Sequence, residues 1–401
     1  MSENDQQPPH GRRLSRRALL GMTGAAGGAV LLGAGGYVAT RNDGSPSPAP
    51  GAAVEPFHGV HQAGITTKQQ KYLQLAAFDV AATGRDGLRS LAKRWTDTAA
   101  TLAAGKGKEP YAPARLTVTF GLGPGVFTDR FGLAGMRPTP LVDIPPFPHD
   151  QLDPAYVGGD LCVQVCSDDQ HTALLAMRDL VSASVGSATV RWRQAGFIRD
   201  PLPGEQGGTP RNLFGFKDGT NNLDATDDAR MRQNVWVAAQ DGPAWMANGS
   251  YLVVRRIQMD VDGFLHEDVS SEQERAIGRQ KASGAPLHQS GGEFQPVDPR
   301  LQPEDTHIMR ANQRKPGSES ERILRRGYNY ADGYDAEVSM QTGGLVFMAY
   351  QRDPRHQFLP IQRRLAHSDR LQHHLFPHGS AIFAIPPGVS NGGYVGETLL
   401  T

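Results

Sequence analysis

Two successive stretches of the chain carry the same order of strand-like and helix-like apolar patterns, and this order limits the folds open to them. In the first stretch the expected strands are 72–81, 115–121, 160–166 and 188–197. One expected helix, at 86–105, follows the first strand, and a second, begun by Asp168 and Asp169, follows the third strand. The second stretch has no sequence similarity to the first but repeats its order, at 250–260, 267–282, 322–330, 343–351, 354–366 and 380–385.

A β-α-β-β-α-β order is that of the split βαβ, or ferredoxin-like, unit. With 401 residues the chain is long enough for two such units. We therefore expect an α+β fold of two ferredoxin-like domains with antiparallel sheets, an N-terminal domain at 57–214 and a C-terminal domain at 215–401. A long Pro-rich loop at 122–159 interrupts the first unit.

Composition excludes several classes of protein. Basic and acidic residues balance, 41 against 41, which gives no basic field for binding nucleic acid. The two cysteines, Cys162 and Cys166, lie four residues apart on one expected strand. That spacing separates them by about 13 Å along the strand, too far for a disulfide. They are predicted to be buried thiols.

Two further patterns are set aside. Gly121, Gly123 and Gly125 follow an expected strand, as in a dinucleotide-binding loop, but Pro124 and the missing helix argue against one. Four histidines near the C-terminus do not have the spacing of a closed zinc site, and a solvated helix end is the preferred interpretation. They are His367, His373, His374 and His378.

The N-terminus has the pattern of an export signal. Ser15-Arg16-Arg17 precedes an apolar pair, and the uncharged, Gly/Ala-rich run at 18–39 is only mildly apolar, which favours a signal sequence over a membrane anchor. We expect a twin-arginine signal peptide at 1–40, a linker at 41–56 and the twin-arginine translocase as a transient partner. The protein would then be periplasmic, in the cell envelope or extracellular. Because this pathway carries folded proteins, a cofactor inserted before export is expected.

The candidate site combines two distant stretches. Gly215-Phe216-Lys217-Asp218-Gly219-Thr220 supplies a carboxylate, and the segments around His307 and Arg325 supply an imidazole and a guanidinium. A haem peroxidase needs these three groups: a nitrogen to hold iron, an acid/base for the peroxide proton and a fixed cation for developing charge. An Asp-Gly pair is, however, more often simply a turn.

From about residue 57 onward the chain resembles the dye-decolourising peroxidases, in particular the exported bacterial branch that includes deferrochelatase. The resemblance lies in motifs that occur in order behind the export signal. They are Phe57-His58-Gly59-Val60-His61-Gln62-Ala63-Gly64-Ile65, Gly158-Gly159-Asp160-Leu161, the Gly215–Thr220 stretch, His307-Ile308, Arg310-Ala311-Asn312 and Ile323-Leu324-Arg325-Arg326-Gly327-Tyr328. One departure is Gln313, where members of the family carry Pro.

The resemblance implies haem b in the C-terminal half. It makes His307 the proximal iron ligand, Asp218 the distal acid/base and Arg325 the distal cation, with its neighbour Arg326 as the second choice. Arg325, Gly219 and Thr220 are also expected to contact the haem. It allows a homodimer.

A proximal imidazole usually donates its other ring proton to a carboxylate. Asp353, which follows the strand at 343–351, is the candidate for that role, although a helix N-cap before Pro354 is the alternative. Both roles could also coexist.

The implied activity is reduction of hydrogen peroxide and oxidation of dyes, phenols or other bulky one-electron donors. Because an unperturbed Asp has a pKa of about 3.9, an acidic optimum is expected. Bulky donors would be oxidised at the surface through aromatic side chains. The candidates are Tyr328, Tyr330, Tyr350, Trp236 and Trp245. The alternatives are a haem-handling protein that releases iron in the cell envelope and a cofactor-free ferredoxin-like binding module.

Overall fold

The computed structural model describes residues 53–107, 113–199, 208–267, 269–335 and 340–401. The expected signal peptide at 1–40 and the linker up to residue 52 lie outside these ranges. Within them, no helix is long and apolar enough to cross a membrane.

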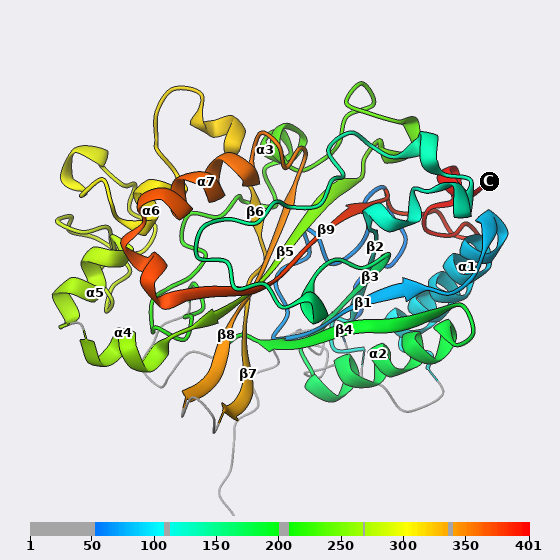
Figure 1. Cartoon of the computed structure of the whole chain (residues 1–401), viewed down its shortest axis with the longest axis horizontal. Coiled ribbons are helices and arrows are strands. Elements are labelled where there is room, and N and C mark those ends of the chain that lie inside the picture. The colour runs from blue at the N-terminus through cyan, green and yellow to red at the C-terminus, as the bar shows by residue number, and fades with distance from the viewer. Residues whose placement is uncertain (1–52, 108–112, 200–207, 268, 336–339) are drawn as a thin grey trace, which may run out of the picture. The chain divides into compact units, whose positions relative to one another are not determined.

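The first half contains the six elements expected from the sequence (Figure 1). Trp95 and Leu91 on the first helix are buried against the sheet, and Asp169 caps the second by accepting a hydrogen bond from the Thr172 N–H. In chain order the elements are β1 (Tyr72–Val80), α1 (Gly84–Ala103), β2 (Thr117–Leu122), β3 (Leu161–Ser167), α2 (Gln170–Ser184) and β4 (Ala188–Phe197).

The second half follows the expected order, but three of its expected elements differ and further short helices are added. The helix expected at 267–282 is shorter than predicted: it begins at Ser270 and ends at Ile277, because the next residue, Gly278, has a φ of +92° that breaks the helix. The strand expected at 322–330 is split in two, and the helix expected at 354–366 begins only at Phe358. The elements are α3 (Asp228–Asn234), β5 (Ser250–Met259), α4 (Val261–Glu267), α5 (Ser270–Ile277), α6 (His307–Ala311), β6 (Leu324–Arg325), β7 (Tyr328–Asp335), β8 (Met340–Gln351), α7 (Phe358–Ser368), β9 (Leu375–Ile385) and α8 (Glu397–Leu400).

The α+β class and the antiparallel pairing are confirmed, but the sheets of the two halves are joined. The strand order is β5-β9-β2-β3-β1-β4-β7-β8, and pairing of β5 with β8 closes it into a barrel. β6 pairs with Ala349 and Tyr350 near the C-terminal end of β8, whereas β7 pairs with the earlier part of β8, up to Val346. The halves meet through single residue pairs, Leu122 with Ala384 and Phe197 with Asn329. One closed barrel therefore replaces two separate sheets.

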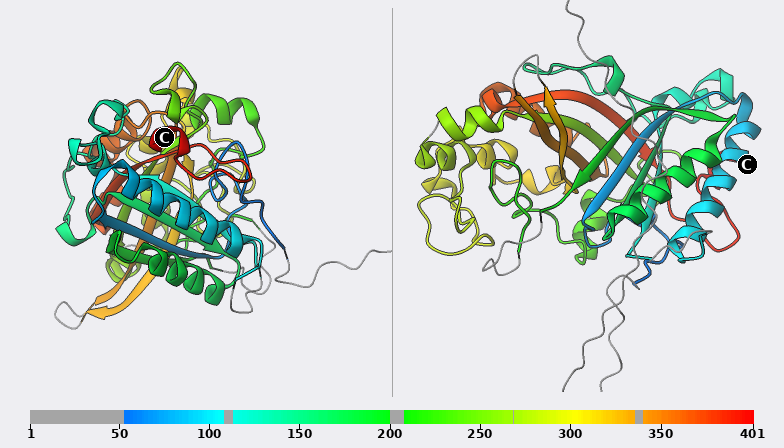
Figure 2. Two further views of the ribbon diagram at one scale, coloured as in Figure 1. Left: turned by 90° about the vertical axis from the view of Figure 1, so that its right-hand side faces the viewer. Right: turned by 90° about the horizontal axis from the view of Figure 1, so that it is seen from below.

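The two faces of the barrel wall have different roles. Apolar side chains from all the long strands except β2 fill the interior, including Leu73, Cys166, Tyr328 and Phe383. Helices α1 and α2 cover the outside of the first half, and α4 to α7 gather on the other side, over the second half (Figures 1 and 2). The outer face of the second half is where the site lies.

The long loop at 122–159 crosses from the first half to the second. Gln151 and Asp153 donate their N–H groups to the carbonyls of Pro377 and His378 on β9, at 2.9 and 2.8 Å. Asp150 from this loop forms a buried ion pair with Arg255 of β5. The loop is thus fastened to β5 and β9, two strands of the second half.

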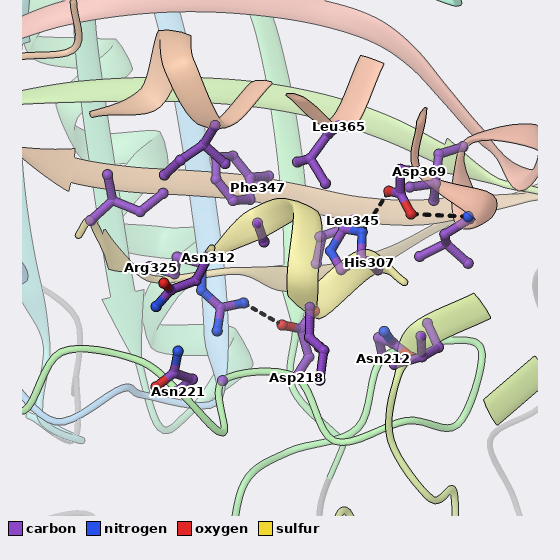
Figure 3. A pocket seen from close by; sticks show the side chains of 18 of the residues that line it. Asn212, Asp218, Asn221, His307, Asn312, Arg325, Leu345, Phe347, Leu365 and Asp369 are labelled. Atoms are coloured by element: carbon purple, nitrogen blue, oxygen red, sulfur yellow. Dashed lines mark hydrogen bonds and ion pairs between the residues drawn. The ribbon is translucent and has the colours of Figure 1, made fainter. Parts of the chain in front are cut away.

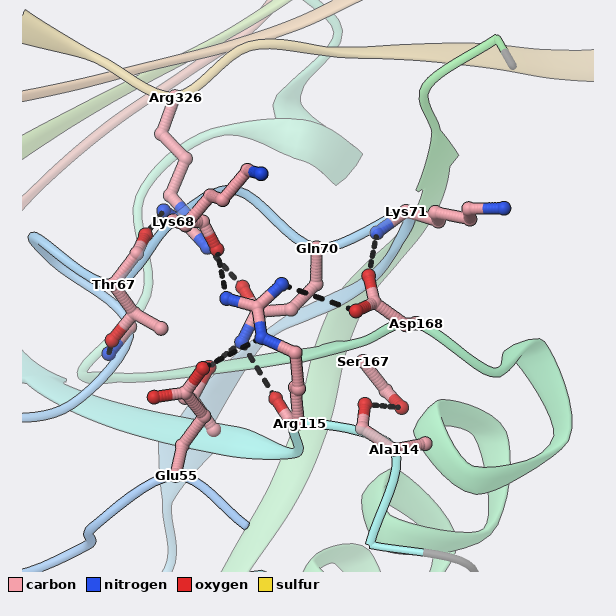
Figure 4. A network of polar contacts seen from close by, with 12 residues as sticks. Glu55, Thr67, Lys68, Gln70, Lys71, Ala114, Arg115, Ser167, Asp168 and Arg326 are labelled. Carbon is pink, nitrogen blue, oxygen red and sulfur yellow. Dashed lines mark hydrogen bonds and ion pairs between the residues drawn. The ribbon is translucent and has the colours of Figure 1, made fainter. Parts of the chain in front are cut away.

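The last residues of the expected linker belong to the folded structure. Glu55 forms an ion pair with Arg115 at 2.7 Å, and Arg115 also pairs with Asp168 at 3.1 Å (Figure 4). The Ala53 carbonyl accepts a hydrogen bond from the Arg115 N–H. The last residues of the segment predicted as a linker, Ala53 and Glu55, thus contact the first half.

Candidate active site

His307 is the first residue of α6, after Thr306, and its ring is fixed by a carboxylate. Its Nδ1 lies 2.7 Å from Oδ2 of Asp369, which is buried. Asp369 follows the end of α7 and accepts a hydrogen bond from the Leu371 N–H through Oδ1. Both carboxylate oxygens are therefore engaged. Because Nδ1 faces Asp369, Nε2 is the ring nitrogen left for a ligand.

The surroundings of His307 stabilise the protonated, cationic form of its imidazole. Burial by itself disfavours the imidazolium, but the charge of Asp369 and its hydrogen bond outweigh burial and raise the pKa of His307 above its ordinary value. Asp218 contributes in the same direction and Arg325 opposes it.

The prediction that Asp353 is the partner of this histidine is wrong. Asp353 forms an ion pair with Arg355 at 2.7 Å and accepts a hydrogen bond from the Arg355 N–H. It therefore caps a turn, although not α7 itself, whose N-cap is Gln357. Asp369 was missed because it lies 62 residues from His307. The available signal was an Asp at the junction of two helical segments.

Asp218 and Arg325 form the second part of the site. The Arg325 Nη1 donates to Asp218 Oδ1 at 2.8 Å (Figure 3). The Asp218 N–H donates to the Pro210 carbonyl, and the next residue, Gly219, has a φ of +126°. Only glycine adopts that conformation readily, which explains the Asp-Gly pair at this turn.

Arg326 points away from this pair. Its guanidinium is buried and donates to the Thr67 carbonyl and to Gln70 Oε1 (Figure 4). Of the two neighbouring arginines, only Arg325 meets Asp218.

His307, Asp369, Asp218 and Arg325 line one cavity of about 220 Å³. Gly219 and Thr220 also lie in its wall. Much of the remaining lining is apolar and comes from β5, β8, α7 and the segment after it. These residues are Ile257, Met259, Leu345, Phe347, Phe358, Ile361, Leu365, Leu371 and Leu375.

The cavity also has a cationic wall. Arg279, Arg314 and Arg322 line it in addition to Arg325. Burial, and then the charges of Arg279 and Arg322, lower the pKa of Arg314 to about 10. The buried Nε of Arg279 has no hydrogen-bond partner within the described residues. Clustered, partly desolvated guanidinium groups favour an anionic ligand.

The aromatic residues proposed for surface oxidation are all buried. Tyr328 and Tyr350 belong to the barrel interior, and Trp236 stacks on His61 at a centroid distance of 3.6 Å. Cys162 and Cys166 are free buried thiols, as predicted. His374 is buried rather than solvated. Among the described residues no cluster of three or more metal-ligating side chains occurs.

Comparison with protein families gives two matches that together cover most of the chain. Residues 62–198 match the model of the Dyp-type peroxidase N-terminal domain, and residues 209–390 match that of the C-terminal domain.

Similar individual proteins agree with these matches. "Deferrochelatase" of Shigella sonnei is 39% identical over 373 residues, covering 86% of this chain and 87% of the relative. A DyP-type peroxidase from Cellulomonas bogoriensis is 39% identical, with a TM-score of 0.81 over 88% of this chain and 99% of its own. DtpA from Streptomyces lividans, solved as an oxyferrous complex, is 38% identical, with a TM-score of 0.82 over 89% of this chain and all of its own.

Proposed function

The chain belongs to the Dyp-type peroxidase family and is a haem-dependent peroxidase, and we propose that His307, Asp218 and Arg325 carry out its chemistry in the cavity described above. The substrates are hydrogen peroxide and an organic electron donor. Dyes and phenols are the donors proposed here.

The residues of the cavity fit haem b. One imidazole nitrogen faces a cavity with apolar walls, as a porphyrin ring requires. The arginines of the cationic wall, including Arg279 with its unpaired Nε, suit the two carboxylates of the porphyrin. His307 would hold the iron through Nε2, and the iron supplies the site that accepts oxidising equivalents from peroxide.

Asp369 sets the properties of the ligand. By accepting the Nδ1 proton of His307 it fixes the tautomer and the ring orientation. Such a carboxylate also increases the basicity of the coordinating nitrogen.

Asp218 moves the peroxide proton. Its Oδ1 accepts the hydrogen bond from Arg325, which leaves Oδ2 to act on peroxide. Oδ2 would take the proton from the peroxide oxygen closer to the iron and give it to the other oxygen, which leaves as water. The Arg325 guanidinium stabilises the negative charge that develops as the O–O bond breaks. Loss of such a donor typically raises a barrier by about 2.7–4 kcal/mol.

We further propose that each half is a ferredoxin-like domain, with haem in the C-terminal one. The strand orders β4-β1-β3-β2 and β9-β5-β8-β7 support this assignment. The twin-arginine translocase, a periplasmic, envelope or extracellular location, and a homodimer are also proposals, of which the first two rest on residues 12–39.

The observation that carries the proposal is that the His307–Asp369 pair and the Asp218–Arg325 pair line the same apolar cavity (Figure 3). The test is the visible absorption spectrum of haem-reconstituted protein. Wild type should show the Soret band of ligated haem, and His307→Ala should lose or strongly shift it. An unchanged spectrum in the variant would reject His307 as the ligand.

A second candidate function is release of iron from haem, and the name of the Shigella sonnei relative favours it. The two activities leave different products. Incubation of haem-loaded protein with a reductant and a ferrous chelator would yield chelated iron and intact fluorescent porphyrin if iron is removed. Peroxide-dependent dye oxidation without porphyrin release would support the peroxidase alone.

A further inference from the structure

The side chain of Asn222 is bonded to both backbone polar groups of Arg325. Its Oδ1 accepts the Arg325 N–H at 2.8 Å, and its Nδ2 donates to the Arg325 carbonyl at 2.7 Å. Such a two-sided contact mimics the hydrogen bonds of a neighbouring strand. The amide therefore holds the Arg325 backbone at both its N–H and its carbonyl group.

This contact fills an open strand edge. Leu324 and Arg325 form β6, which pairs with Tyr350 and Ala349 of β8. The next residue, Arg326, donates its N–H to the Met348 carbonyl on β8. Because backbone groups alternate in direction along an antiparallel strand, the N–H and C=O of Arg325 point away from β8. Among the described residues no strand pairs with that edge of β6, and the Asn222 side chain takes the place of one.

Asn222 belongs to the same turn as Asp218. It lies four residues later, and its N–H donates to the Gly219 carbonyl at 3.0 Å. Asn222, Asp218 and Arg325 also line a small cavity of about 40 Å³ that adjoins the main one. The segment that carries the carboxylate is thus fastened to the strand that carries the guanidinium.

We propose that Asn222 is a positioning residue that sets Arg325 against Asp218, an inference that rests on the proposed function of that pair. The side-chain bond from Arg325 Nη1 to Asp218 Oδ1 needs both backbones in fixed register. A long Arg side chain can reach one carboxylate oxygen from several backbone positions, and the amide clamp selects one of them. A misplacement of about 1 Å at a reacting group can cost about 100-fold in rate.

The test is the second-order rate constant for reaction of haem-loaded protein with hydrogen peroxide, measured by stopped-flow absorbance. Asn222→Ala should lower this constant by about 10- to 100-fold. It should leave the Soret band unchanged, because His307 and Asp369 lie outside the contact.

Gln62 offers a matched control. Its side-chain amide clamps a backbone in the same way, accepting the Phe120 N–H at 2.8 Å and donating to the Phe120 carbonyl at 3.0 Å, and it also donates to the Pro386 carbonyl at 2.9 Å. It does not line the main cavity. Gln62→Ala should destabilise the fold at least as much as Asn222→Ala but keep the peroxide rate constant within about threefold of wild type, because Gln62 does not contact the reacting groups.

The double variant separates positioning from general destabilisation. If Asn222 acts through Arg325, adding Asn222→Ala to Arg325→Ala should cause no further loss of rate. Three results would overturn the proposal. The first is that Asn222→Ala lowers the rate of Arg325→Ala by the same factor as it lowers the rate of wild type. The others are that Asn222→Ala alone leaves the rate unchanged or loses its haem. A normal rate in Arg325→Ala would reject the role of Arg325 itself, and with it the reason for Asn222.

Discussion

Arg325 and Arg326 are neighbours in the sequence, yet their guanidinium groups serve different parts of the molecule. Arg325 reaches Asp218 in the cavity on the outer face of the barrel, at 2.8 Å. Arg326 reaches Gln70 and the Thr67 carbonyl, close to the interior side chains of Tyr328 and Tyr350. Adjacent residues on a strand face opposite sides, so only one of the two can belong to the site.

The two arginines should therefore give opposite phenotypes. Arg325→Ala is expected to slow the peroxide reaction by about 10²–10³-fold, the usual cost of one charge-stabilising donor, with little change in thermal stability. Arg326→Met should leave the buried Oε1 of Gln70 without its donor and lower the free energy of unfolding by about 1–3 kcal/mol. Stopped-flow kinetics and denaturant titration of both variants check this. The reverse pattern would contradict the assignment of Arg325.

Asp369 and Asp353 form a second pair for comparison. Asp369→Ala removes the acceptor of the His307 Nδ1 proton and should weaken haem binding by about 10–100-fold. Asp353→Ala breaks a partly exposed ion pair with Arg355 and one hydrogen bond from the Arg355 N–H, and should lower the free energy of unfolding by about 1 kcal/mol without affecting haem. Titration of each apoprotein with haem measures the difference. Equal haem affinity of the two variants would disprove the role given to Asp369.

These pairs show where sequence reasoning ended. Asp218 and His307 could be identified because each lies in a motif that resembles the dye-decolourising peroxidases, and because a haem peroxidase needs a carboxylate, an imidazole and a guanidinium together. Asp369 could not, because an Asp that caps a short helix looks the same whether or not a distant histidine lies beside it. Asn222 was missed for a similar reason: its role depends on the unpaired edge of β6, which becomes apparent only when β8 is in place.

Glu293 gives a pH-dependent stability near the site. Its carboxylate binds Lys217 at 2.9 Å and the Thr209 N–H at 3.1 Å. Burial alone would raise the pKa of Glu293, but these hydrogen bonds outweigh burial and lower it. Because the pKa of Glu293 is lower in the folded state, its ionised carboxylate stabilises the fold at pH values above its unfolded-state pKa of about 4.3. That stabilisation is lost as the pH falls through the folded-state pKa.

Glu293→Gln should therefore lower the free energy of unfolding by about 1–3 kcal/mol at pH 7. The difference from wild type should shrink below about pH 4.3. Denaturant titrations at pH 7 and at acid pH measure it, with Asp86→Asn as the control because Asp86 is 88% exposed. A difference independent of pH would show that the charge of Glu293 is not involved.

The export signal makes a separate prediction. Replacing Arg16 and Arg17 by Lys should leave the protein in the cytoplasm with its haem bound, because the residues of the proposed haem site lie between Asp218 and Asp369, far along the chain from the signal. Fractionation of cells, followed by a peroxidase assay of each fraction, measures this. Unchanged export of the double variant would rule out the twin-arginine pathway.

The fold was predictable in its local elements and less so in its assembly. Periodic apolar residues such as Leu88, Leu91 and Trp95 identify α1 without any tertiary information. Closure of the barrel depends instead on pairing of β5 with β8 and on two single-residue contacts, of which one joins Phe197 to Asn329. No local pattern signals such a pair, because its free energy comes from the packed interior around it.

The central claim is that Asp218 carries the peroxide proton in a haem site held by His307. The most direct test is the pH dependence of the peroxide rate constant for haem-loaded wild type and Asp218→Ala. We predict that the variant retains the Soret band and reacts about 10²–10⁴-fold more slowly, with the pH dependence of the wild type lost. A variant that reacts as fast as wild type, with the same pH profile, would contradict the account.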